Sequence, residues 1–162
     1  MTTQHLTIKP LAMTDTDSIY PLTSDPDITK YMRFSVHQGR DETKIMVEDY
    51  IKNSYAFSLT ETASGGFVGV FVLKRDEEAA ALSITTFLNK DFFAKGYATE
   101  ALAAMIRFSK EYLFAKKLKA YIVQENTASC RVAEKNGFTL HHTLDFPDMP
   151  CPLLVYELGL EG

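Results

Sequence analysis

The chain has 162 residues, a formal net charge of −4, and 46% hydrophobic and 23% charged residues. These values are typical of one globular domain over residues 1–162, and no linker or repeat divides the sequence. It has no basic tract for nucleic acid and no apolar run near the roughly 18 residues of a membrane helix, so we expect a cytoplasmic protein that binds neither. Its two cysteines have no metal-binding spacing, and we expect no metal.

The first third of the chain predicts a strand followed by helices. Residues 5–11, HLTIKPL, alternate between polar and apolar side chains as a strand does. Thr14 and Asp25 are expected helix N-caps, with Pro26 at a first helical position. Apolar residues at helical spacing predict a longer helix over residues 41–55.

The rest of the chain alternates strands and helices. Strands are expected over residues 56–62, 67–75, 80–88, 118–124, 138–144 and 152–158, and helices over 97–114 and 126–136. The segment 63–66, Ala-Ser-Gly-Gly, is typical of a hairpin turn, and Asn126 is an expected N-cap. This order predicts a mixed α/β sheet, with a right-handed parallel crossover over residues 79–124.

Residues 92–102, FFAKGYATEAL, form a glycine-containing turn that leads into a helix. Such a turn directs unpaired backbone N–H groups at one point and suits a phosphate. A mononucleotide P-loop would need a Lys-Ser or Lys-Thr pair after the glycine, but Tyr97 follows Gly96. A dinucleotide motif would need G-x-G-x-x-G, but Ala94 and Thr99 occupy the first and third glycine positions. Both nucleotide interpretations are therefore weak.

The run FLNKDFFAKGYATEAL, followed by LKAYIVQ and ENTASCRVAEKNGF, resembles the GNAT N-acetyltransferases. The similarity is to the RimJ/RimL-like branch, whose founding members acetylate ribosomal-protein N-termini. The family signature Q/R-x-x-G-x-G/A aligns with residues 93–98, where Gly96 and Ala98 match and Phe93 departs. The resemblance covers nearly the whole chain. It implies the GNAT fold, a mixed and mostly antiparallel sheet that is splayed at a central parallel strand pair and flanked by helices.

By this resemblance the cosubstrate is acetyl-CoA, with its pyrophosphate on the backbone amides from Ala94 to Thr99. Backbone groups near Phe87 and Leu88 and the side chain of Asn126 would contact the pantetheine arm. The residues implied to bind acetyl-CoA are Phe87, Leu88, Ala94, Lys95, Gly96, Tyr97, Ala98, Thr99, Asn126 and Ser129. Two alternatives stay open: Lys95 as a solvated surface lysine, and Asn126 as an N-cap only.

Acetyl transfer to an amine needs a neutral amine, an oxyanion site and a proton for the leaving thiolate. Many family members supply the proton from a tyrosine, but Ala133 occupies that position, and the resemblance implies Ser129 instead. The alternative for Ser129 is a second capping hydroxyl. The family's usual glutamate position is Ser83, so Glu125 is the nearest acidic candidate for the base, with a solvated carboxylate as the alternative.

Two histidines on the strand 138–144 are further candidates for the base. Neighbours on a strand face opposite sides, so at most one of His141 and His142 should act. Tyr31 and Phe34 are candidates to line the acceptor pocket, although both could equally be core residues.

The expected acceptor follows from the missing strong base. An α-amino group, with a pKa of about 7.8, is already partly neutral near pH 7.5, whereas a lysine amine costs roughly 4 kcal/mol to deprotonate there. We therefore expect an acyltransferase that acetylates a peptide N-terminal α-amine or a small amine by direct attack on the thioester. We expect a monomer or homodimer. The alternative is a catalytically weak acyl-CoA sensor or interaction module on the same fold.

Overall fold

The computed structural model describes residues 1–161, so the expected domain, 1–162, ends at a residue outside the described part. The chain forms two compact units. The N-terminal unit contains Met1–Lys74 and Thr85–Tyr97, and the C-terminal unit contains Arg75–Ile84 and Ala98–Gly162. Strand β4 belongs to both, because its first half lies in the C-terminal unit and its second half in the N-terminal unit.

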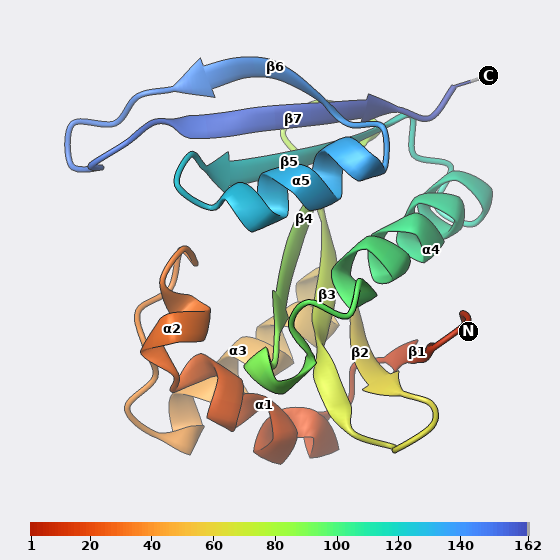
Figure 1. Cartoon of the computed structure of the whole chain (residues 1–162), viewed down its shortest axis with the longest axis vertical. Helices are drawn as coiled ribbons and strands as arrows, with labels where there is room; N and C mark the ends of the chain where they lie inside the picture. The colour runs from red at the N-terminus through yellow and green to blue at the C-terminus, as the bar shows by residue number, and fades with distance from the viewer. Residues whose placement is uncertain (162) are drawn as a thin grey trace. The chain divides into compact units, whose positions relative to one another are not determined.

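The N-terminal unit packs helices against one part of the sheet (Figure 1). Its elements are β1 Leu6–Pro10, a 3-10 turn Met13–Asp15, α1 Thr16–Thr23, α2 Pro26–Thr29, α3 Arg40–Asn53, β2 Tyr55–Glu61, β3 Phe67–Arg75, the second half of β4 Ala81–Leu88, and a 3-10 turn Lys90–Phe92. Its core is formed by apolar side chains of α1, α3, β2, β3 and β4 and of the residue after β1: Leu11, Ile19, Leu22, Val47, Tyr50, Ala56, Val70, Val72 and Phe87.

One of the two expected N-caps in this unit is confirmed. The Asp25 carboxylate accepts the Asp27 N–H at 2.9 Å, and Pro26 begins α2. Thr14 is wrong, because it lies inside the 3-10 turn that precedes α1. Asp15 is the N-cap residue of α1, and its carboxylate reaches back to the Ala12 N–H at 2.9 Å.

The C-terminal unit contains the other half of β4 together with α4 Tyr97–Glu111, β5 Lys117–Val123, α5 Thr127–Lys135, β6 Thr139–Leu144 and β7 Leu153–Gly159. Helix α5 lies against β5 (Figure 1). Helix α4 ends at Glu111, earlier than the expected residue 114. Phe114 adopts a positive φ of 53°, which turns the chain away from helical geometry, and Tyr112, just after the helix, is 67% exposed.

The strands follow the order β1-β2-β3-β4-β5-β7-β6. Strands β4 and β5 are parallel, and the β1–β2, β2–β3, β5–β7 and β6–β7 pairs are antiparallel. The predicted mixed, mostly antiparallel sheet with helices is therefore confirmed, including the parallel connection through α4. The β4–β5 register pairs only Ala81, Leu82 and Ser83 with Lys117, Leu118 and Lys119. The predicted splay beyond these pairs stays a prediction.

The two neighbouring histidines of β6 do not face opposite sides, and that expectation is wrong. Leu140 pairs with Tyr156 and His142 pairs with Val155, so the register shifts by one residue at His141. Such a bulge breaks the alternation of the strand. The Nδ1 atoms of His141 and His142 lie 2.8 Å apart as a result.

Across the described residues, we find no helix with the length and apolar character that crossing a bilayer requires.

Candidate active site

The turn before α4, in the N-terminal unit, has the backbone geometry of an anion site. Ala94 and Gly96 both have positive φ, at 62° and 77°, so the chain folds back tightly on either side of Lys95. This conformation is strained for alanine and natural for glycine. A Cβ built on Gly96 would meet no heavy atom within 4 Å, so the space beside the turn is open.

The side chains of the turn are already engaged with strand β2. The Tyr97 hydroxyl donates to Glu61 Oε2 at 2.5 Å, and Lys95 Nζ lies 3.6 Å from the same oxygen. Hydrogen bonds from Ser64 and Tyr97, together with Lys95, lower the pKa of Glu61, which is therefore a carboxylate at neutral pH. These contacts anchor the turn through its side chains, and the Lys95 ammonium pairs with Glu61.

The backbone N–H groups of the turn are left available for an anion. Within residues 1–161, the N–H groups of Ala94, Lys95 and Gly96 donate to no other group. The 15-residue helix α4 begins immediately after them, and the first N–H groups of a helix have no intrahelical acceptor and lie at its positive end. A diphosphate fits this arrangement. The departure at Phe93 removes the polar side chain of the family signature but leaves these backbone donors, and the phenyl group itself is 53% exposed.

The neighbouring end of β4 is held in place by a close approach of β3. A Cβ at Gly69 would lie 2.4 Å from the Phe87 carbonyl oxygen, so only glycine allows this contact. The Thr86 hydroxyl donates to the Val70 carbonyl at 2.8 Å, and the Asn89 N–H donates to the Val68 carbonyl at 2.7 Å. The backbone at Phe87 and the residue after it, Leu88, is therefore fixed.

In the C-terminal unit, the start of α5 carries the predicted pair Asn126 and Ser129. Asn126 Oδ1 accepts the Ser129 N–H at 3.3 Å, so the N-cap alternative for Asn126 is confirmed as one of its roles. Both side chains are partly exposed. Asn126 Nδ2 and Ser129 Oγ make no hydrogen bond to any residue the structure describes. Each residue therefore keeps one polar atom for a ligand.

The residue after Ser129 has a packing role. Cys130 is buried, and burial raises the pKa of its thiol, which makes it a poor nucleophile. It contacts the buried Tyr156 of β7, and burial and this contact raise the pKa of Tyr156 to about 12.

A link between α5 and α4 was missed from the sequence. Asn136 Nδ2 donates to the Thr99 carbonyl at 3.4 Å and to the Val132 carbonyl at 3.1 Å. This bond fixes the first turn of α4, which contains Ala98 and Thr99, to the C-terminal end of α5. In a sequence, an asparagine before a glycine indicates the end of a helix, but it does not indicate which group on another helix the asparagine side chain will bind.

The two positions considered for the catalytic base in the sequence do not supply a suitable group. Glu125 is exposed at the end of β5, and its carboxylate has no partner in the described chain. Ser83 forms the last β4–β5 pair, opposite Lys119. Neither position shows a carboxylate held for proton transfer.

A buried histidine in the N-terminal unit was also missed. His37 is 8% exposed, and burial lowers its pKa despite the opposing charge of Glu42. Its Nδ1 lies 2.7 Å from the Thr43 hydroxyl, which lies 2.9 Å from the Thr23 hydroxyl. The sequence shows that His37 lies between two expected helices, but it does not show which hydroxyl groups contact the imidazole.

The structure brings one of the two predicted acceptor residues next to this histidine. The Phe34 ring lies 5.2 Å from the His37 ring and 5.9 Å from the Phe87 ring, so it connects the histidine to the end of β4. Tyr31 is partly exposed, with the Lys30 ammonium 5.2 Å from its ring centre.

Comparison with known proteins gives the class of this chain. Residues 5–139 match the model of the acetyltransferase (GNAT) domain. The chain is 27% identical over 143 residues to the uncharacterized N-acetyltransferase p20 of Bacillus licheniformis, covering 84% of this chain and 80% of p20. The chain therefore belongs to the GNAT acetyltransferases, as the motifs predicted, and is an acyltransferase for which acetyl-CoA is the cosubstrate.

Solved structures share its fold. A GNAT-family acetyltransferase from Bacillus anthracis has a TM-score of 0.90 and 23% identity, covering 100% of this chain and 99% of that one. The ribosomal L7/L12 α-N-protein acetyltransferase RimL, in complex with CoA, has a TM-score of 0.86 and 16% identity, covering 97% and 95%. Spermidine N-acetyltransferase from Vibrio cholerae, in complex with CoA and spermine, has a TM-score of 0.85 and 16% identity, covering 98% and 97%.

Proposed function

We propose that this protein transfers the acetyl group of acetyl-CoA to a peptide N-terminal α-amine or a small primary amine. The observation that carries this proposal is the turn from Ala94 to Gly96. It presents backbone N–H groups and the positive end of α4 to an anion, while its own side chains are bound to Glu61.

In this proposal the pyrophosphate binds to the amides from Ala94 to Thr99. The backbone near Phe87 and Leu88 and the Asn126 side-chain amide hold the pantetheine arm. The fixed position of β4 against Gly69 supports this role, because a backbone that binds like a neighbouring strand must not shift. When bound, the thioester supplies the activated acetyl group.

Ser129 is the proposed proton donor to the leaving thiolate. Its N–H is occupied by Asn126, but its hydroxyl is available on the first turn of α5. The N–C bond forms as the amine attacks the carbonyl carbon, the C–S bond then breaks, and the sulfur takes a proton from the hydroxyl. Ser129 regains a proton from solvent, and the base releases the amine proton to solvent, so the reaction balances.

His37 is the proposed base for the acceptor amine, in preference to Glu125. The Thr23 hydroxyl donates its single proton to the Tyr20 carbonyl at 3.3 Å, so the Thr43 hydroxyl donates to Thr23. Thr43 must then accept from His37 Nδ1–H, which leaves Nε2 unprotonated and able to accept a proton. The lowered pKa keeps the imidazole neutral at pH 7.

A histidine of lowered pKa is a weak base, and this favours an acceptor amine that is already partly neutral. An α-amine meets this condition better than a lysine side chain. RimL, named for an α-N-protein acetyltransferase, shares the fold and supports the same acceptor class. Spermidine N-acetyltransferase also shares it, so a small polyamine is the second acceptor to test.

The test is a thermal-shift and turnover experiment. Acetyl-CoA and CoA should raise the unfolding temperature, whereas ATP and NAD should not. Thiol release should then appear with a panel of N-terminal peptides, polyamines and other amines. An unfolding temperature that acetyl-CoA does not change would contradict the proposal. A raised unfolding temperature without turnover on any amine of the panel would favour an acyl-CoA sensor.

The His37 role has a separate test. His37→Gln should lower kcat/KM by about 100-fold or more, because a positioned base contributes roughly 10²–10⁴-fold. Thr43→Val should also lower the rate, since it removes the hydroxyl that fixes the tautomer, whereas Thr43→Ser keeps that hydroxyl and is the matched control. An equal loss in Thr43→Val and Thr43→Ser would contradict the hydrogen-bond argument.

The same group sets a pH dependence. The folded pKa of His37 is below its unfolded value, so the unfolded chain binds the extra proton as the pH falls below about 6.5. Stability that is fully present above this pH should therefore decline in acid, and the decline should be shallower in His37→Gln. Chemical denaturation between pH 5 and 8 measures it, and equal slopes in both proteins would be evidence that His37 is not held neutral.

A further inference from the structure

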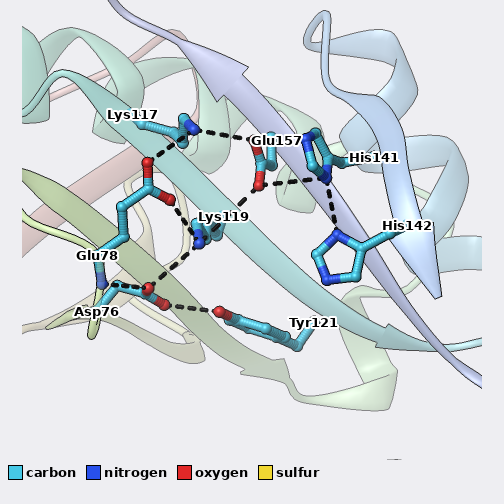
Figure 2. Close-up of polar contacts among 8 residues, drawn as sticks. All are labelled: Asp76, Glu78, Lys117, Lys119, Tyr121, His141, His142 and Glu157. Atoms are coloured by element: carbon cyan, nitrogen blue, oxygen red, sulfur yellow. Dashed lines mark hydrogen bonds and ion pairs between the residues drawn. The ribbon is translucent and has the colours of Figure 1, made fainter. Parts of the chain in front are cut away.

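The bulge in β6 places two histidines on one side of the β6–β7 hairpin. Leu140 pairs with Tyr156 and His142 pairs with Val155, so His141 is the extra residue. Figure 2 shows both imidazole rings near Glu157 of β7, with His141 between His142 and the carboxylate. A regular strand would have separated these rings, so the bulge creates the cluster.

The three side chains offer ligand atoms at close range. One nitrogen from each histidine and one oxygen of Glu157 lie within 4.8 Å of one another. The two Nδ1 atoms are 2.8 Å apart, and His141 Nδ1 is 3.9 Å from Glu157 Oε2. A tetrahedral ion with bonds of about 2.0–2.1 Å separates its ligand atoms by roughly 3.3 Å. The observed distances lie on either side of that value, so small ring rotations would complete the site.

The charges around the cluster favour a cation. Glu157 Oε1 lies 3.1 Å from Lys117 Nζ, and Glu157 Oε2 lies 3.9 Å from Lys119 Nζ. The same two ammonium groups are also held by Glu78, at 2.9 and 2.7 Å. Asp76 adds a contact of 3.4 Å to Lys119 (Figure 2).

Three carboxylates therefore share two lysines, and one negative charge is left over. Hydrogen bonds from Lys119 and Lys117 lower the pKa of Glu78. Burial opposes the same shift at Asp76, but bonds from the Glu78 N–H and Tyr121 still lower its pKa. Glu78 and Asp76 are thus ionised at neutral pH, and the lysines that they share with Glu157 lie next to the two imidazoles.

We propose that His141, His142 and Glu157 bind a divalent transition-metal ion, with Zn²⁺ as the first candidate. Imidazole nitrogens suit Zn²⁺, Ni²⁺ and Cu²⁺, whereas Mg²⁺ and Ca²⁺ prefer oxygen ligands alone. The ion neutralises the excess carboxylate charge and ties β6 to β7. The His141 side chain is 59% exposed, so an ion can reach the cluster from solvent.

The test is zinc binding to the chelator-treated full chain, in the absence of acetyl-CoA. Isothermal titration with ZnCl₂ should give one ion per chain, and Zn²⁺ but not Mg²⁺ should raise the unfolding temperature. Titration with Co²⁺ should produce the visible absorption of a low-symmetry site containing nitrogen ligands.

Variants assign the ligands. His141→Ala and His142→Ala should each weaken zinc binding at least about tenfold, and the double variant should remove it. Both side chains are exposed, so these variants should fold. His5→Ala, which removes the other exposed histidine, should bind zinc as the wild type does. Glu157→Gln should weaken binding while keeping the side-chain shape.

Unchanged zinc affinity in the double variant would overturn the proposal. Loss of binding in His5→Ala would also overturn it, because the ion would then occupy a different site. These measurements use no acetyl-CoA and no turnover, so their failure leaves the acetyltransferase proposal standing.

Discussion

The turn before α4 and the first turn of α5 both belong to the predicted cofactor site, but they leave different atoms for a ligand. In the turn, the side chains of Lys95 and Tyr97 are bound to Glu61, and backbone N–H groups remain. At α5, the backbone N–H of Ser129 is capped by Asn126, and side-chain atoms remain. The first site therefore depends on the conformation of the chain, and the second depends on the identity of two side chains.

This difference predicts which substitutions matter. In the turn, a change of backbone geometry or a blocked space should abolish binding, whereas loss of a side chain should have little effect. At α5, removal of a single polar atom should be visible, even when the helix itself is unchanged.

The largest effect is expected at Gly96. Gly96→Glu places a carboxylate in the open space beside the turn, where it blocks and repels the pyrophosphate, and should abolish the thermal shift with acetyl-CoA. Gly96→Ala is the matched control. It meets no neighbour and should cost only about 1–2 kcal/mol of backbone strain, with acetyl-CoA binding weakened but present. Normal binding in Gly96→Glu would show that the phosphate site lies elsewhere.

Ser129 should give the next largest effect, on turnover. Ser129→Ala removes the proposed proton donor and should lower kcat at least about tenfold with a smaller change in KM. The Ser129 N–H bond to Asn126 does not depend on the hydroxyl, so helix α5 should stay intact. Ser129→Thr keeps a hydroxyl and should retain most of the activity. A change confined to KM would argue against proton donation.

A smaller effect on affinity is expected at Asn126, where the two functions of one side chain can be separated. Asn126→Asp keeps the capping oxygen but loses the Nδ2 donor, so stability should be preserved while KM for acetyl-CoA rises about fivefold, the value of one hydrogen bond. Asn126→Ala loses both and should also cost about 1 kcal/mol of stability. Equal KM values for Asn126→Asp and wild type would show that Asn126 caps the helix and does not bind acetyl-CoA.

The smallest effect is expected at Lys95. Its side chain is 49% exposed and paired with Glu61, and exposed pairs contribute little. Lys95→Ala should change KM for acetyl-CoA by less than about fivefold. Steady-state kinetics at low and moderate salt measures this, and a loss of more than tenfold would place the ammonium on the phosphate instead.

The local features of the chain were predictable from its sequence. Helix starts and tight turns depend on contacts between residues that are close in the chain. The residue types at Asp25, at Asn126 and at the glycine turns were therefore enough to predict them. The prediction at Thr14 was wrong because a 3-10 turn, Met13–Asp15, precedes α1 and makes Asp15 its N-cap residue.

The family motifs in turn identified the fold and the cosubstrate. By contrast, the partners of Lys95, His37 and Glu157 were not predictable, because each lies on another element.

The sequence by itself thus determined the order of elements, the GNAT family and the turn that suits a pyrophosphate, since all three are written in local patterns. The tertiary structure decided which atoms of those residues stay available. Pairing with Glu61 leaves the turn only its backbone, and the buried His37 lies against the Thr43 hydroxyl, which in turn contacts the Thr23 hydroxyl. A register shift against β7 turned two alternating histidines to one side. Each of these depends on contacts between distant segments, which a local pattern does not encode.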